Sequence, residues 1–171
     1  MNAPRRDRPV ALVEDCVSRL AIEPVISHAA DDLLAAVRQA AAQPQTRVVG
    51  VVDQDGRLVG IVPIVRLVEA VIARVSPEWL LADIAGVDDV ARFGEEVEAR
   101  TVGDVMLEPA AVTLTTSISA AFRLMHERRI SGVYVVDDAG RPIGYMDLLE
   151  LAVLDIDAIE QRSLERGTAD G

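Results

Sequence analysis

The chain has 171 residues, of which 50% are hydrophobic and 26% charged, so it can bury an apolar core and lacks the composition of a disordered protein. This length allows one ordinary domain or two small ones and excludes a multidomain enzyme. The formal net charge of -11 comes from 28 carboxylates and 17 basic residues. Such a surface repels phosphate groups, which argues against nucleic acid as a partner.

Residues 1–14 have the composition of a flexible N-terminal tail, with prolines and the basic cluster Arg5, Arg6 and Arg8. Cys16 is the only cysteine, which excludes an internal disulfide and is typical of the cytoplasm. The start of the sequence has no apolar signal region, and no apolar run approaches the ~20 residues of a membrane helix. We therefore expect a cytoplasmic protein without membrane insertion.

The chain contains an internal repeat. Residues 51–60 align with residues 135–144 at a constant offset, and six of the ten aligned residues are identical. The match extends upstream, where the first copy carries one extra residue. Two copies of one unit, at residues 15–75 and 101–156, therefore account for most of the chain.

Each copy predicts the order strand, helix, strand, strand, helix. A short apolar strand, at Val25-Ile26 and at 110–112, precedes small polar residues that can cap a helix, at 31–32 and at 115–117. The helix that follows has one apolar stripe. Its residues are Leu33, Leu34, Val37 and Ala41 in the first copy and Ile118, Ala121, Phe122 and Met125 in the second.

A hairpin follows the helix in each copy. β-Branched runs at 48–52 and 133–136 are each closed by Asp-x-x-Gly and resumed by a second apolar strand. The turn glycines, Gly56 and Gly140, lie where a positive φ angle is expected, and the aspartates of the motif can bond the turn amides. Second helices are predicted at 65–74 and 148–156.

The hairpin motif V-V-D-x-x-G-R-x-x-G, with its lead-in at 127–132, resembles the CBS domain, named after cystathionine β-synthase. Residues 102–106 are similar to the opening V-x-D-V-M of that family. The two copies together resemble a tandem CBS pair, or Bateman module. The resemblance implies an α+β fold in which two β-α-β-β-α repeats pack as one pseudo-twofold module.

Between the copies, residues 76–100 form an acidic connector whose apolar residues are spaced for short docked helices. Its aromatic residues, Trp79 and Phe93, are either packing anchors or part of a partner-binding surface. Residues 157–171 have the composition of a polar C-terminal tail.

The resemblance implies two clefts that bind adenosine-containing ligands such as AMP, ADP, ATP or S-adenosylmethionine. In the family, a hydroxyl and a carboxylate that follow the second hairpin glycine contact phosphate and ribose. The first copy departs from this pattern with Pro63 and Arg66 at these positions. The second copy has Asp147 and Glu150, of which Glu150 can still bind a ribose, whereas Asp147 repels a phosphate unless magnesium or Arg129 intervenes.

The candidate ligand-binding residues are Val112, Thr113, Arg129, Ser131, Val133, Asp147, Glu150 and Arg66. Simpler interpretations remain for three of them. Asp147 and Glu150 can lie in the first turn of the last helix, where acids favour the helix dipole, and Arg66 can form a surface ion pair instead of facing an anionic ligand. His28 and His126 have no neighbours at metal-ligand spacing, so we expect no metal site.

No catalytic motif is present: the sequence lacks GxSxG, GxGxxG and HExxH, and it has no lysine for a P-loop. We therefore expect a non-catalytic regulatory module that needs no cofactor, senses an adenosine-containing ligand and signals to an unknown partner protein. We also expect a homodimer, with Leu148, Leu151 and Leu154 either at its interface or in the core. The alternatives are a ligand-free dimerising adaptor and a sensor in which Asp147 and Glu150 hold magnesium.

Overall fold

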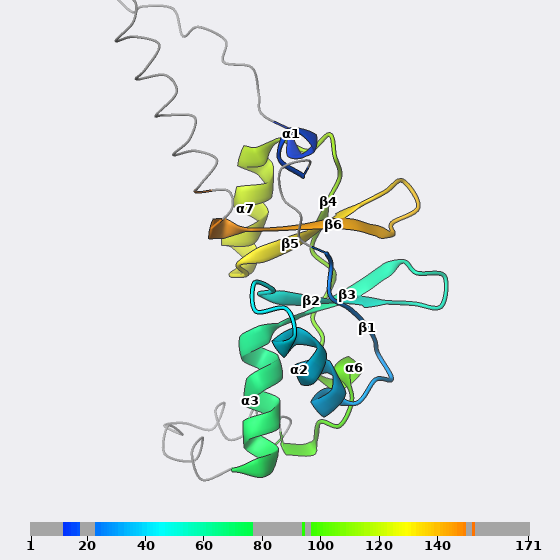
Figure 1. The fold of residues 1–171 in the computed structure, drawn as a ribbon, viewed down its shortest axis with the longest axis vertical. Coiled ribbons are helices and arrows are strands. Elements are labelled where there is room, and N and C mark those ends of the chain that lie inside the picture. The colour runs from blue at the N-terminus through cyan, green and yellow to red at the C-terminus, as the bar shows by residue number, and fades with distance from the viewer. Residues whose placement is uncertain (1–11, 18–22, 77–93, 95–96, 150–151, 153–171) are drawn as a thin grey trace, which may run out of the picture.

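The computed structural model describes residues 12–17, 23–76, 94, 97–149 and 152 (Figure 1). The fold is α+β, as the sequence predicts. The described helices are α1 (Val13–Val17), α2 (Leu33–Ala41), α3 (Ile64–Val75), α6 (Val102–Val105) and α7 (Ile118–Arg128). The strands are β1 (Ile26–His28), β2 (Val48–Val52), β3 (Leu58–Pro63), β4 (Ala111–Val112), β5 (Gly132–Val136) and β6 (Pro142–Asp147).

The strands form two three-stranded sheets, with the orders β1-β2-β3 and β4-β5-β6. In each sheet the first strand is parallel to the second, and the second and third form an antiparallel hairpin. The hairpin turns have the predicted chemistry, because Gly56 and Gly140 have φ angles of 77° and 78°. Asp53 and Asp137 each accept two hydrogen bonds from turn amides.

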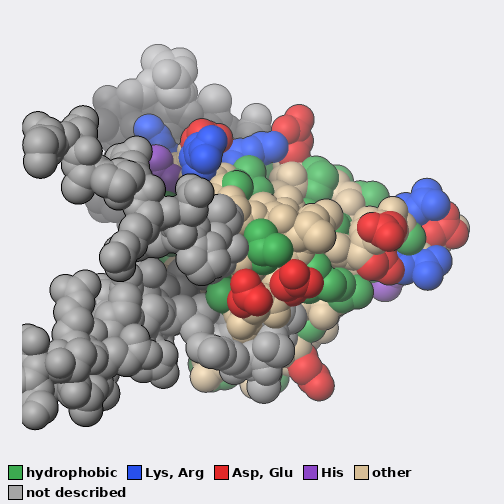
Figure 2. Space-filling view, turned by 90° about the horizontal axis from the view of Figure 1, so that it is seen from above, with side chains coloured by type: hydrophobic (Ala, Val, Ile, Leu, Met, Phe, Trp, Pro, Cys, Tyr) green, Lys and Arg blue, Asp and Glu red, His purple; other side chains and the backbone are tan. Residues whose placement is uncertain are grey.

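The two sheets lie against each other in the middle of the molecule (Figure 1). Helices α2 and α3 cover the outer side of one sheet, and α1 and α7 cover the other. Both hairpins project in the same direction, and the Leu58 amide donates to the Gly140 carbonyl at 2.9 Å. Acidic and basic side chains gather at this end of the molecule (Figure 2), where Arg141 Nε donates to the Asp55 carbonyl at 3.1 Å.

Helix α1 precedes the first copy in sequence but packs on the second copy. The amides of Val13 and Glu14 donate to the carbonyls of Thr116 and Leu114 at 2.9 and 3.0 Å. Val13 is fully buried. Residues 12–14 of the tail expected at 1–14 are thus part of the fold, because Val13 is buried in the core of the second repeat.

Helix α6 shows the reverse arrangement: it opens the second copy in sequence but packs on the first copy. The amides of Val102 and Gly103 donate to the carbonyls of Asp31 and Ala29 at 2.9 and 2.8 Å. A capping box between Thr101 and Asp104 starts the helix. The short helix that opens each copy therefore belongs to the core of the other copy.

The predicted stripe on α7 is wrong at Phe122, which is 53% exposed. Ala121 and Met125, one helical turn apart, are fully buried and define the inner face, and Phe122 lies about 100° further round the helix. In α2 the inner face is Leu33, Ala36 and Ala40, so the predicted Ala41 is exposed for the same reason.

Several expected features lie outside the described residues. These are most of the connector at 76–100, with Trp79 and Phe93, most of the final helix and the C-terminal tail. Leu148 is described and packs against the core cluster around the second sheet, whereas Leu151 and Leu154 are outside. Among the described helices, none combines the length and apolar character that crossing a membrane requires.

Candidate binding site between the repeats

The interface between the repeats is built around Tyr134, which extends from β5 into the first sheet. Its hydroxyl accepts a hydrogen bond from the Gly50 amide at 2.7 Å and donates toward the carbonyl oxygens of Val25 and Val48, at 2.6 and 3.0 Å. Tyr134 is fully buried, and this burial raises the pKa of its hydroxyl, which therefore stays protonated and able to donate.

Gly50 provides the space for this ring. A Cβ atom at position 50 would lie only 2.7 Å from Cζ of Tyr134. The internal repeat aligns Gly50 with Tyr134, so the residue without a side chain in one copy faces the large ring in the other. The contact is therefore asymmetric although the backbones are pseudo-symmetric.

A second tyrosine adds to this asymmetry. The Tyr145 hydroxyl, from β6, accepts a hydrogen bond from the Arg47 amide at 3.0 Å. Its ring lies over Gly132, where a Cβ atom would be 2.6 Å from Cζ of Tyr145. The rings of Tyr134 and Tyr145 meet edge to face, with centroids 5.3 Å apart. Both phenols belong to the second copy, and both bond the backbone of the first.

Arg47 and Ser131 are equivalent positions in the two copies. The carbonyl of Arg47 accepts from the Ile64 amide at 3.0 Å, and the carbonyl of Ser131 accepts from the Leu148 amide at 3.0 Å. Ile61 stands in the first copy where Tyr145 stands in the second, and its backbone pairs with the segment before β4 through Leu107. The aliphatic Ile61 cannot bond an amide of the second copy as Tyr145 bonds that of Arg47.

Three predicted site residues lie together at the end of the second sheet away from the hairpin turn. Gly132 pairs with Asp147 in the ladder, Val133 pairs with Met146, and Ser131 precedes them. Asp147 is 4% exposed, and its Oδ1 accepts from the Leu149 amide at 2.8 Å. This carboxylate thus caps the start of the last helix, which agrees with the simpler interpretation of Asp147.

Arg129 lies two residues before Ser131, at the end of α7. Its backbone is left-handed, with a φ of 53°, and it is the only described residue other than glycine with a positive φ. Both Arg129 and Ser131 are exposed.

Val112 and Thr113 lie toward the opposite end of the second sheet. Val112 pairs with Val135 near the hairpin turn, four residues along β5 from Ser131. The amide and hydroxyl of Thr113 contact the Thr116 hydroxyl in a local turn, at 3.0 and 3.2 Å. The structure therefore does not bring this pair together with Arg129 and Ser131.

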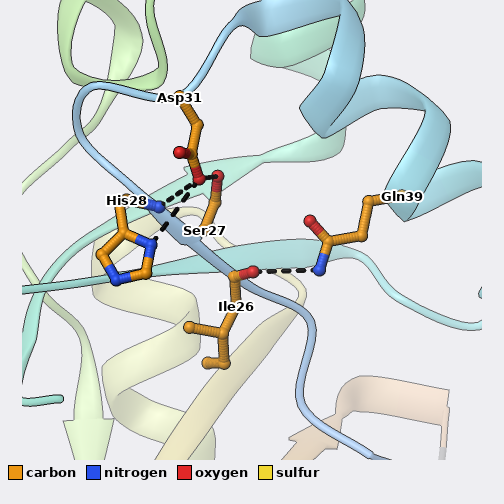
Figure 3. Close-up of polar contacts among 5 residues, drawn as sticks. All are labelled: Ile26, Ser27, His28, Asp31 and Gln39. Atoms are coloured by element: carbon orange, nitrogen blue, oxygen red, sulfur yellow. Dashed lines mark hydrogen bonds and ion pairs between the residues drawn. The ribbon is translucent and has the colours of Figure 1, made fainter.

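The turn of the first copy that is equivalent to the turn between Thr113 and Thr116 is built around Asp31 (Figure 3). Its Oδ2 accepts from the His28 amide at 2.6 Å and from the Ser27 hydroxyl at 2.8 Å, and it lies 3.7 Å from Nδ1 of His28. These hydrogen bonds, that of the His28 amide first, lower the pKa of Asp31. Within the described part of the chain, no group of three or more His, Cys, Asp or Glu residues could hold a metal ion.

Arg66 is the one predicted site residue on the first copy. Its Nε donates to the carbonyl of Val105 at the end of α6, at 2.8 Å. Arg66 thus holds the exchanged helix, a contact that neither sequence interpretation anticipated. Glu150 lies outside the described residues.

The sequence interpretation missed the two tyrosines and their glycines. The signal was present, because the repeat alignment places Gly50 opposite Tyr134 and Ile61 opposite Tyr145. A small residue aligned with a large one across a pseudo-twofold axis indicates a complementary contact.

Comparison with known proteins agrees with this architecture. The CBS domain family model matches residues 102–153. A CBS domain-containing protein from Thermotoga maritima, TM0935, superposes with a TM-score of 0.68 at 21% identity, covering 86% of this chain and 95% of the other. No match was found among curated proteins.

Two further structures with this fold contain ligands. The CBS domain pair of MJ0100, in complex with 5′-methylthioadenosine and S-adenosyl-L-methionine, has a TM-score of 0.64 at 19% identity and covers 88% of this chain and 99% of its own. CBSX2 from Arabidopsis thaliana in complex with AMP has a TM-score of 0.62 at 20% identity and covers 86% and 97%.

Proposed function

We propose that the chain, in which residues 102–153 match the CBS domain family model and which has the fold of a tandem CBS pair, is a non-catalytic sensor of an adenosine-containing ligand. The observation that carries the proposal is the paired arrangement of the two sheets, shared with pairs that bind AMP or S-adenosylmethionine. The ligand binds between the repeats and changes their relative orientation, which a partner protein detects.

The residues at the second sheet fit such a ligand. The exposed Arg129 guanidinium can pair with a phosphate or carboxylate, and the Ser131 hydroxyl and amide supply further donors. The neighbouring Val133 is fully buried in the core of the second repeat and supports the strand below such a ligand. The proposal includes no magnesium, because Asp147 Oδ1 already accepts a hydrogen bond from the Leu149 amide.

A ligand-free adaptor is the second candidate. It is favoured by the engagement of two predicted ligand contacts in the fold itself, namely Asp147 at a helix start and Arg66 at the carbonyl of Val105. In this alternative the tyrosine pair simply joins the repeats. Either function is compatible with a cytoplasmic protein whose single cysteine, Cys16, is buried in the core.

Thermal unfolding in the presence of AMP, ADP, ATP, S-adenosylmethionine and NAD, each with and without magnesium, tests the sensor. A ligand at a hundredfold excess over its dissociation constant adds about 2.7 kcal/mol, which corresponds to a shift of several degrees. A higher unfolding temperature with at least one adenosine compound supports the sensor. If a chelator abolishes this increase, the alternative in which Asp147 holds magnesium is supported. No shift with any of them supports the adaptor.

We further propose that two copies of the chain associate through exposed apolar helix residues. Val65 and Val75 on α3 are 68% and 65% exposed, and Leu149 is 62% exposed. Light scattering after gel filtration should give the mass of a dimer, and Val65→Glu should reduce it to that of one chain. A monomeric wild-type protein contradicts this part of the proposal.

A further inference from the structure

We propose that Met106 is a site of reversible oxidation, at which a peroxide converts the thioether to a sulfoxide and thereby loosens the attachment of helix α6 to the first copy. The inference goes beyond the proposed function and does not depend on a ligand. It rests on the exposure of Met106, on its contact with Gly60, and on its place between two attachments of the second copy to the first.

Met106 is the exposed methionine in the described part of the chain. It is 36% exposed, whereas Met125 and Met146 are fully buried in the core cluster around the second sheet. A peroxide must reach the sulfur atom to oxidise it, so exposure decides which methionine reacts first. Met106 should therefore be oxidised while Met125 and Met146 remain intact.

The side chain of Met106 lies against the backbone of β3. A Cβ atom at position 60 would be 2.9 Å from its Sδ and 3.4 Å from its Cγ, so this side chain occupies space that only a glycine leaves. Gly60 itself is buried. Oxidation turns the apolar thioether into a larger, polar sulfoxide. The new oxygen must either lose its contacts with water or draw the side chain away from β3, and both outcomes weaken the contact with Gly60.

This contact lies between two attachments to the first copy. On one side, Val105 is buried in the core cluster of the first copy, and its carbonyl accepts from Arg66 Nε at 2.8 Å. On the other side, the Leu107 amide donates to the Ile61 carbonyl at 2.8 Å, and the Leu107 carbonyl accepts from the Ile61 amide at 3.0 Å. Met106 is the residue between them, at the end of α6. A displacement of its side chain therefore acts on both attachments.

The repeat makes this site one-sided. The residue of the first copy that aligns with Met106 is Ala21, which has no sulfur. Oxidation should therefore affect the attachment of α6 to the first copy and leave the attachment of α1 to the second copy unchanged.

The chemical step is an oxygen transfer. A lone pair of the Met106 sulfur attacks one oxygen of hydrogen peroxide, the S–O bond forms as the O–O bond breaks, and the other oxygen leaves as water after proton transfer. The sulfur is oxidised and the peroxide is reduced. A thiol-dependent methionine sulfoxide reductase reverses the change.

Treatment of the full chain with hydrogen peroxide, followed by peptide mapping with mass spectrometry, tests the site. We expect one added oxygen on Met106, formed about tenfold faster than on Met125 or Met146. The oxidised protein should have a lower urea midpoint, and the reductase should restore the original midpoint. Oxidation of Met125 or Met146 before Met106 would overturn the inference.

Met106→Leu is the matched control, because leucine has nearly the same volume and no sulfur. Peroxide should leave the urea midpoint of this variant unchanged, and a decrease that persisted would come from another residue such as Cys16. In the wild type, oxidation should accelerate amide exchange at Leu107 but not at Val13, whose amide holds α1. If the Met106 sulfoxide formed without a change in the midpoint or at Leu107, Met106 would have no such role.

Discussion

The Thr46 hydroxyl is buried, with the residue 5% exposed, and has no hydrogen-bond partner within the described part of the chain. The equivalent residue of the second copy is Ile130, which is also buried. The position therefore accepts an aliphatic side chain in one repeat and carries an unpaired polar atom in the other. An unpaired buried hydroxyl opposes folding, because it loses its contacts with water and gains none.

Thr46→Val keeps the shape of the side chain and removes this hydroxyl. We expect the free energy of unfolding to rise by about 1–2 kcal/mol. Urea unfolding should show a higher midpoint with an unchanged slope. The control is Thr101→Val, whose hydroxyl contacts Asp104 at 2.9 Å and whose loss should lower the midpoint. A lower midpoint for Thr46→Val would show that its hydroxyl has a partner.

Asp31 makes stability depend on pH. Its pKa is lowered from the ordinary value of 3.8, chiefly by the hydrogen bond from the His28 amide. The carboxylate therefore stabilises the fold above pH 3.8, and this stabilisation is lost as the pH falls toward the lower pKa of the folded state. Asp31→Asn should lose less stability than the wild type between about pH 5 and pH 3. If the wild type and Asp31→Asn lost the same stability over this range, Asp31 would not contribute to the pH dependence.

At the scale of elements, the sequence predicts what is determined locally. The Asp-x-x-Gly turns and the caps at Asp32 and Ser117 depend on residues a few positions apart, and the structure has them where expected. The sequence predicts the inner faces of α2 and α7 less accurately. Both helices carry apolar residues on two neighbouring faces, and the spacing alone does not decide which face is buried. The helical spacing from Ile118 places both Ala121 and Phe122 on the predicted stripe, but Ala121 and Met125 fill the inner face and Phe122 is exposed.

The contact between β2 and β5 depends on residues far apart in sequence, and it yields a prediction at this scale. Gly50→Ala should destabilise the protein by about 1–3 kcal/mol, because the new Cβ atom overlaps the Tyr134 ring. A double-mutant cycle measures this directly, since Tyr134→Leu removes the overlapping atoms. In that background Gly50→Ala should cost clearly less. Equal costs in both backgrounds would place the effect of Gly50→Ala elsewhere.

At the scale of the whole molecule, the exchanged helices α1 and α6 join the two repeats into one unit. The sequence shows the repeat boundaries but not this exchange, because nothing local to Val13 or Val102 indicates which copy their side chains enter. Val13 belongs to the apolar cluster of the second copy, with Val48 and Ile61 contributed by the first. Val102 belongs to the cluster of the first copy. Each core is therefore incomplete without residues from the other repeat.

This arrangement predicts that the two repeats unfold together. Val13→Ala and Val102→Ala each remove two buried methyl groups, from different cores, and each should lower the free energy of unfolding by roughly 1–3 kcal/mol. NMR signals from both repeats should be lost at one urea midpoint in the wild type, and both variants should move the midpoints of both repeats equally. If Val13→Ala moved only signals of the second copy, the repeats would be separate folding units, and α1 would be a local attachment.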